Sequence, residues 1–186
     1  IVSQILLVAA ATLGLVLGDV YVQPRPPETQ SLLRWHFLTG LAAALAVVLV
    51  ESIIVTYFIG TSRWCKEVVE TYRLDPAVVQ ASNRLKHRTF PRALVGMLAS
   101  IGIIALGGAS DPATGPNTRA WVDWHFAVAI GGIVLIAWTY FAAWNNVVAN
   151  QAIINKLVSK VEEARRQRRA ANLAAGLTEP AERHPA

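Results

Sequence analysis

The stretch that decides the fold is Trp35–Gly60, WHFLTGLAAALAVVLVESIIVTYFIG, whose 26 positions contain a single Asp, Glu, Lys or Arg residue, Glu51. Its apolar residues run continuously instead of following one helical face, which is typical of a membrane-spanning helix. About 20 helical residues cross roughly 30 Å of hydrocarbon, so the stretch is long enough. Trp35 at one end and the Tyr-Phe pair at 57–58 at the other match the two headgroup levels, where aromatic rings are enriched.

Three further segments have the same character: 1–22, 93–109 and 121–148. The whole chain is 54% hydrophobic and 16% charged, whereas a soluble domain is about 45–50% apolar and about 25% charged. We interpret 1–22 as a retained span and not a signal peptide, because it shows no basic n-region and no small-residue cleavage site. The sequence therefore predicts an all-α integral membrane protein, a four-helix transmembrane bundle that forms one domain over 1–150.

The basic residues predict the orientation of this bundle. Fourteen of the 17 Lys and Arg residues lie in two regions, the loop 61–92 and the segment that follows position 150. Basic loops are retained in the cytoplasm, so we expect both ends inside, with short outer loops at 23–34 and 110–120. The predicted location is the bacterial cytoplasmic (inner) membrane, as a multi-pass protein. Attraction to anionic lipid explains the net charge of +5, so the lipid bilayer is an expected partner and nucleic acid is not.

Two regions outside the spans have their own pattern. Within loop 61–92, Asp75 and Pro76 are suited to the start of an amphipathic cytoplasmic helix over 77–89. Segment 151–175 is predicted to extend the last span as a helix in the cytoplasm, and 176–186 to be a disordered tail. Apolar residues repeat at helical spacing in the extension, and this stripe would dock on loop 61–92 or on another subunit: Ile153, Ile154, Leu157, Val158 and Val161.

Segments 35–60 and 121–148 resemble each other. RWHF at 34–37 matches DWHF at 123–126, and each is followed by small residues and later by a Tyr-Phe pair, at 57–58 and 140–141. Two explanations stay open: a parallel repeat of two helical hairpins, and chance similarity between two Trp-rich interfaces.

The matched histidines of these motifs, His36 and His125, are the candidate cofactor-binding residues. Both open a predicted span near the outer face, so a flat tetrapyrrole, haem b or (bacterio)chlorophyll, would fit between them with both imidazoles as axial ligands. Gly40 and Gly131, one turn further along, would leave room for the ring. The alternatives are a copper or other metal site, for which two histidines are an incomplete set of ligands, and simple packing at the headgroup level.

Glu51 is the intramembrane polar candidate. It lies about 22 Å along the helix from His36, where an ionised carboxylate costs several kcal/mol. Ser52, Thr56 and Ser100 are the side chains expected to satisfy it. Proton transfer or quinone binding is one interpretation, and a structural hydrogen bond within the bundle or to another subunit is the other.

The functional prediction follows from size and from missing motifs. The sequence contains no nucleotide-binding, HExxH or CxxC motif, and its lone cysteine, Cys65, cannot form an intramolecular disulfide, so no enzyme activity and no metal centre are predicted. We expect an accessory transmembrane subunit of a larger electron-transfer complex, respiratory or photosynthetic, with other membrane subunits as partners. The alternatives are a small b-type cytochrome that relays electrons through a haem ligated by His36 and His125, and a small transporter or channel with Glu51 in its path.

In outline, the layout is similar to that of the four-helix cytochrome b membrane subunits. Two-haem members of that group use four intramembrane histidines, whereas this chain offers two, both near one face. The resemblance therefore implies at most one haem, and it argues against a two-haem relay across the bilayer.

Overall fold

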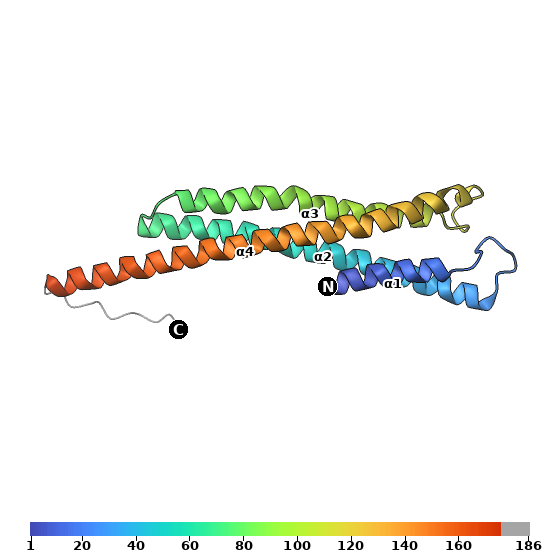
Figure 1. Ribbon diagram of the computed structural model, residues 1–186, viewed down its shortest axis with the longest axis horizontal. Helices are drawn as coiled ribbons and strands as arrows, with labels where there is room; N and C mark the ends of the chain where they lie inside the picture. Colours follow the sequence, from blue (N-terminus) through green and yellow to red (C-terminus); the bar gives the residue numbers. More distant parts are fainter. Residues whose placement is uncertain (176–186) are drawn as a thin grey trace.

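The computed structural model of the protein describes residues 1–175, and within them the chain is helical, with no strand. The elements are α1 (Val2–Val16), α2 (Pro27–Tyr72), α3 (Ala77–Ala109), the short 3-10 helix η1 (Thr118–Trp121) and α4 (Val122–Ala174), and they lie side by side along one axis (Figure 1). The predicted all-α class is confirmed. Within the described residues, three helices are long and apolar enough to cross a membrane: α2, α3 and η1–α4 taken together. The predicted tail 176–186 lies outside the described residues.

The first helix is shorter than the predicted span 1–22. α1 has 15 residues and ends at Val16, after which Leu17 adopts an extended backbone. Gly18 weakens helix propagation, and the Asp19 carboxylate accepts a hydrogen bond from the Tyr21 backbone N–H at 2.9 Å, which favours a turn. At 1.5 Å per residue, α1 is about 22 Å long.

The region 61–92 differs from the prediction of a loop with its own helix. α2 runs without a break through 46 residues to Tyr72, and α3 begins at Ala77 and continues through Pro91 to Ala109. The amphipathic segment 77–89 is thus the first part of α3. Arg73 ends α2 in the left-handed conformation, with φ 52°, and the Asp75 carboxylate accepts the Ala77 backbone N–H at 2.9 Å as α3 begins.

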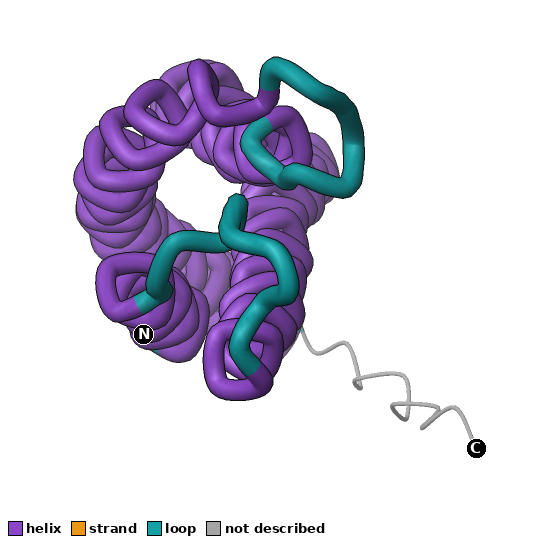
Figure 2. The backbone as a smooth tube through the Cα atoms, turned by 90° about the vertical axis from the view of Figure 1, so that its right-hand side faces the viewer, coloured by secondary structure: helices purple, strands orange, loops and turns teal. Residues whose placement is uncertain are grey.

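The helices form a bundle with two apolar clusters along its length. α2 packs mainly against α1 and α3, and α3 packs mainly against α4, so α2 and α4 lie diagonally across the ring seen end-on in Figure 2. One cluster contains Leu7, Ala43, Val47 and Ile136. The second lies toward the α2–α3 turn and contains Cys65, Val69, Val78 and Leu157.

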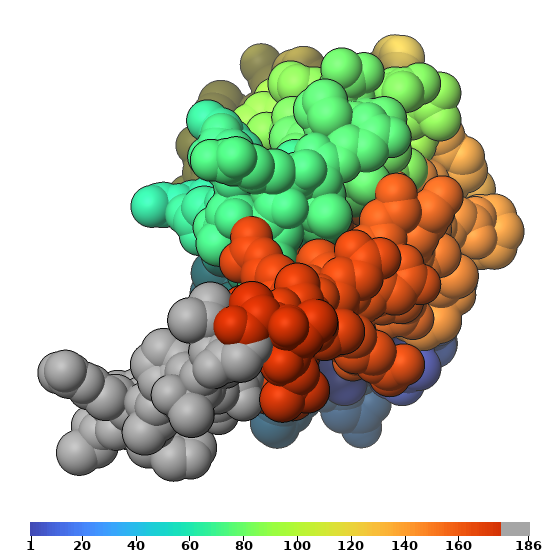
Figure 3. Space-filling model, turned by 90° about the vertical axis from the view of Figure 1, so that its left-hand side faces the viewer, coloured from blue at the N-terminus to red at the C-terminus, as the bar shows by residue number. Residues whose placement is uncertain are grey.

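The second cluster identifies the surface on which the 151–175 stripe docks. Ile153, Ile154 and the fully buried Leu157 pack against residues of α2 and α3 on either side of their turn. Of the two docking alternatives, the contact with region 61–92 is therefore the one formed. Figure 3 shows this end of the molecule, with α4 in orange and red beside the green α2–α3 hairpin. In Figure 1 the end of α4 extends past the α2–α3 turn.

The connections α1–α2 and α3–η1 lie together at the opposite end of the bundle (Figure 1). The Tyr21 hydroxyl donates a hydrogen bond to the Ser110 carbonyl at 2.7 Å, and Arg119 lies 3.6 Å from an Asp19 carboxylate oxygen. These contacts join the two halves of the chain beyond the ends of α1 and α3.

Candidate functional site

The fold brings the two matched histidines together. His36 comes from α2 and His125 from α4, and their ring centroids are 6.1 Å apart with an angle of 80° between the planes. Both side chains are half-buried. A separation of 89 residues in sequence thus becomes a direct ring contact across the bundle.

The neighbouring helix α1 holds the ring of His36 in place. Nδ1 of His36 lies 2.8 Å from the Ala10 carbonyl oxygen. Because a carbonyl only accepts, this contact places the proton on Nδ1 and leaves the lone pair on Nε2. A Cβ atom at Gly14 would lie 3.0 Å from Cε1 of the ring, so any larger residue there would crowd the imidazole.

Helix α3 approaches the His125 ring almost as closely as α1 approaches the His36 ring. A Cβ atom at Gly107 would lie 3.2 Å from Cε1 of His125. A backbone interaction with Ile103 reaches this ring, but its geometry falls short of a hydrogen bond, and within residues 1–175 the buried Nδ1 atom has no hydrogen-bond partner.

The two environments support the repeat of two hairpins that the sequence suggested. In each hairpin, the residue whose carbonyl faces the ring precedes the contacting glycine by four positions, Ala10 before Gly14 and Ile103 before Gly107. Sequence reasoning missed these glycines. The signal that could have identified them is a Leu-Gly dipeptide in each hairpin, at 13–14 and at 106–107. The glycines it chose, Gly40 and Gly131, have no atom within 4 Å of an added Cβ, so neither touches a histidine ring.

The donor set fits a tetrapyrrole better than a bare metal ion. A metal–imidazole bond is about 2.0–2.1 Å long and the ring centroid lies roughly 1 Å further on, so two imidazoles on one metal have centroids about 6 Å apart. Within residues 1–175, no third His, Cys, Asp or Glu joins the pair, and two ligands are an incomplete shell for zinc or copper. A tetrapyrrole supplies its own four nitrogens and needs only axial ligands. Edge-to-face rings also pack at 4.5–7 Å, so spectroscopy must separate the two explanations.

Glu51 lies near the middle of the bundle and is fully buried. One carboxyl oxygen is 2.7 Å from the Thr139 hydroxyl, and a Cβ atom at Gly96 would overlap the same oxygen. The other oxygen, Oε2, has no partner within the described residues. Within residues 1–175, the predicted partners Ser52, Thr56 and Ser100 make no hydrogen bond with it. Its partner is Thr139 of α4, which the sequence did not single out.

A second polar cluster joins α2, α3 and α4 nearer the α2–α3 turn. The fully buried Asn150 side chain accepts a hydrogen bond from Ser82 at 3.1 Å and donates to Tyr57 and Thr61 at 3.2 and 3.0 Å. All the hydrogen-bonding groups of this amide are paired, so its role is to fix the rotation of the three helices.

No family model, curated protein or solved structure matches this chain. The functional argument therefore rests on the residues and geometry described above.

Proposed function

We propose that this protein is a transmembrane electron-transfer subunit of a bacterial inner-membrane complex, respiratory or photosynthetic, in which His36 and His125 are the axial ligands of one tetrapyrrole. Haem b is favoured over (bacterio)chlorophyll, because two neighbouring imidazoles would suit an iron that takes two axial ligands. The observation that carries the proposal is the ring pair, 6.1 Å apart with one tautomer set by a backbone carbonyl. A bound haem would supply one-electron transfer, which is why no enzymatic step is assigned to the chain itself.

The chain's own residues would bind and orient the group. The Ala10 carbonyl keeps the proton of His36 on Nδ1 and thereby presents Nε2 as a ligand. Gly14 and Gly107 allow α1 and α3 to approach the two rings and limit their rotation. Hydrogen bonding at the second nitrogen also makes an imidazole a stronger ligand.

The proposal includes four spans with both ends of the chain in the cytoplasm. In support, the connections α1–α2 and α3–η1 lie at one end of the bundle, while the basic α2–α3 hairpin and the α4 extension lie at the other. α1 is the shortest of the four proposed spans, and in support of its insertion it lies beside α2, with the Ala10 carbonyl bonded to His36.

Partner subunits are proposed from the outer surface. Large apolar side chains are exposed along all four helices, including Leu45, Leu49 and Ile53 on α2. Lipid tails and the helices of neighbouring subunits cover such faces equally well.

The test is the visible spectrum of the protein purified from its native membrane. We expect a Soret band that is lost in His36→Ala and in His125→Ala. His87→Ala is the matched control, because His87 is exposed on α3 and outside the pair, and it should keep the band. A colourless native protein, or equal spectra for all three variants, would show that the ring contact is packing only.

A further inference from the structure

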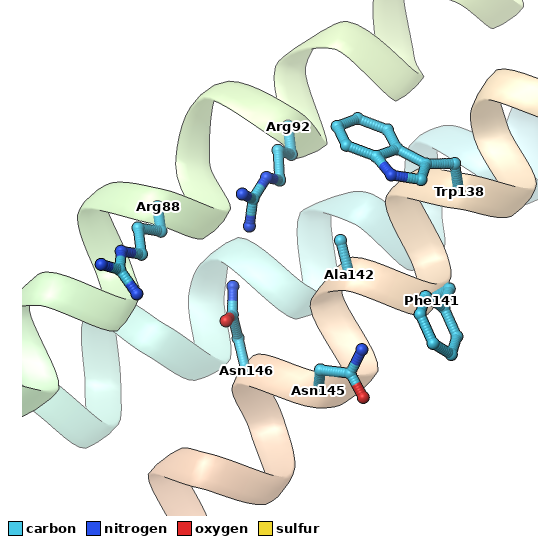
Figure 4. A pocket seen from close by; sticks show the side chains of 7 residues that line it. All are labelled: Arg88, Arg92, Trp138, Phe141, Ala142, Asn145 and Asn146. Carbon is cyan, nitrogen blue, oxygen red and sulfur yellow. The ribbon is translucent and has the colours of Figure 1, made fainter.

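A groove between α3 and α4 combines two arginines with aromatic and amide side chains. It has a volume of about 370 Å³, and Figure 4 shows Arg88 and Arg92 on α3 facing the residues of α4. The α4 side is formed by Trp138, Phe141, Ala142, Asn145 and Asn146.

The positive charge of the groove is not balanced by a neighbouring acidic side chain within the described part of the chain. None of its seven lining residues is acidic. Within residues 1–175, neither Arg88 nor Arg92 pairs with a carboxylate, unlike Arg63, Lys66 and Arg119. Two guanidinium groups on successive turns of one helix face would repel each other unless an anion lies between them.

Several contacts hold the groove in shape. The Arg92 guanidinium lies 5.7 Å from the centroid of the Trp138 ring, a cation–π contact that leaves its N–H edges available. Asn146 donates a hydrogen bond to the buried Thr89 hydroxyl at 2.9 Å. The exposed Asn145 makes no hydrogen bond within the described residues, so its amide is available to a ligand.

The position of the groove indicates the source of the anion. Arg92 directly precedes the predicted span 93–109, and Asn145 lies close to the end of the span 121–148, so both belong to the proposed cytoplasmic headgroup level. Trp138, Phe141 and the nearby Trp144 are at least half exposed, as interfacial aromatic residues are. The cytoplasmic leaflet carries the anionic lipids, and basic pockets between helices on that side bind their headgroups.

We propose that this groove binds the phosphate of an anionic phospholipid headgroup, with Arg88 and Arg92 as its ligands and Asn145 as a further donor. The planar guanidinium fork matches phosphate oxygens in pairs, which a lysine cannot do. The acyl chains would run along the exposed faces of Trp138 and Phe141, toward the middle of the bilayer. This proposal rests on the membrane location and orientation given in the proposed function, and it does not depend on the tetrapyrrole.

The test uses the full chain in detergent, stripped of lipid and titrated with phosphatidylglycerol, with native mass spectrometry counting the lipid retained. Phosphatidylglycerol should bind at least about tenfold more tightly than phosphatidylcholine, and R88Q/R92Q should remove most of this difference. The matched control is R84Q/K86Q, which removes two charges from the same helix outside the groove and should change the affinity less than about threefold. Circular dichroism checks that each variant keeps its helix content.

A second variant and a soluble competitor separate specific recognition from general attraction. R88K/R92K keeps both positive charges but loses the planar guanidinium groups that donate two parallel hydrogen bonds to a phosphate. It should bind phosphatidylglycerol at least about threefold more weakly than the wild type. Equal losses in the groove and control variants, or wild-type affinity in R88K/R92K, would overturn the proposal. So would displacement of the lipid by glycerol phosphate at equal concentration, which would identify a soluble-anion site. If the purified protein binds the lipid but is colourless, the haem proposal is contradicted and the lipid proposal stands.

Discussion

Gly14 and Gly107 occupy corresponding places, one against each histidine ring. An added Cβ would lie 3.0 Å from the His36 ring and 3.2 Å from the His125 ring, closer than ordinary van der Waals contact. The cost of a methyl group here depends on whether the ring can turn away. Turning the His36 ring would break its hydrogen bond with the Ala10 carbonyl.

We therefore predict that Gly14→Ala and Gly107→Ala each destabilise the protein by about 1–3 kcal/mol, the usual cost of overpacking, and shift or weaken the Soret band. The measurements are thermal unfolding in detergent and the visible spectrum. The controls are Gly40→Ala and Gly131→Ala, whose methyl groups meet nothing within 4 Å and which should stabilise the helices by about 0.5–1 kcal/mol. Equal effects of all four substitutions would show that the ring contacts carry no constraint.

Glu51 makes one hydrogen bond, with the Thr139 hydroxyl, and its other carboxyl oxygen has no partner within residues 1–175. The Thr139 hydroxyl lies within hydrogen-bond distance of both Glu51 and the Ile136 carbonyl, at 2.7 and 2.8 Å. It has one proton for the two acceptors, so a protonated Glu51 that donates to Thr139 satisfies both contacts. This arrangement favours a structural role over an ionised site, and it agrees with the cost of an unpaired charge in hydrocarbon.

At the scale of elements, the extension of α4 completes the second apolar cluster. α4 has 53 residues, about 80 Å of helix, which is far more than one membrane crossing requires. Leu157 is fully buried in one cluster with Val69, Val78 and the equally buried Cys65. Burial raises the pKa of the Cys65 thiol, against a smaller opposing effect of its hydrogen bond with Ser82.

We predict that Leu157→Ala opens this cluster and speeds maleimide labelling of Cys65. Loss of a buried leucine costs about 2–5 kcal/mol, and a fall of only about 1.4 kcal/mol in the local opening free energy would raise the labelling rate tenfold. Leu173→Ala is the matched control, because Leu173 is 79% exposed on the same helix. The two variants would label at the same rate if the extension did not hold the hairpin closed.

At the scale of the whole molecule, cysteine labelling can test how many helices cross the bilayer and in which direction. The native Cys65 is a poor labelling site for this purpose, since its side chain is buried and would react slowly with a maleimide. Cysteines placed at exposed positions in a Cys65→Ser background are better: Val2→Cys at the start of α1, Glu70→Cys near the α2–α3 turn and Asn117→Cys between α3 and η1.

For four spans with both ends inside, we predict that a membrane-impermeant maleimide labels Asn117→Cys in intact cells. Val2→Cys and Glu70→Cys should react only after lysis. Labelling of Val2→Cys in intact cells would mean that α1 does not cross the bilayer, which would leave three spans. The reverse pattern at positions 70 and 117 would invert the orientation, and the arginine groove would then face the other leaflet.

The sequence by itself determined the helical class, the apolar segments and the charge asymmetry, because hydrophobicity and charge are properties of each residue and are read along the chain. It also identified the two histidines as a pair, through the repeated RWHF and DWHF motifs. Asp75 and Pro76 marked the start of a helix at Ala77 correctly, since the turn in which Asp75 accepts the Ala77 N–H is a local interaction.

Only the tertiary structure decided which side chains meet across helices. The contacts of His36 with Gly14, of Glu51 with Gly96 and Thr139, and of Leu157 with Val78 depend on the rotation and register of helices far apart in sequence. The same is true of the groove at Arg88 and Arg92. A continuous apolar helix has no stripe that indicates which face points inward, so small residues and buried polar groups set that rotation, and their partners become visible only once the helices are packed.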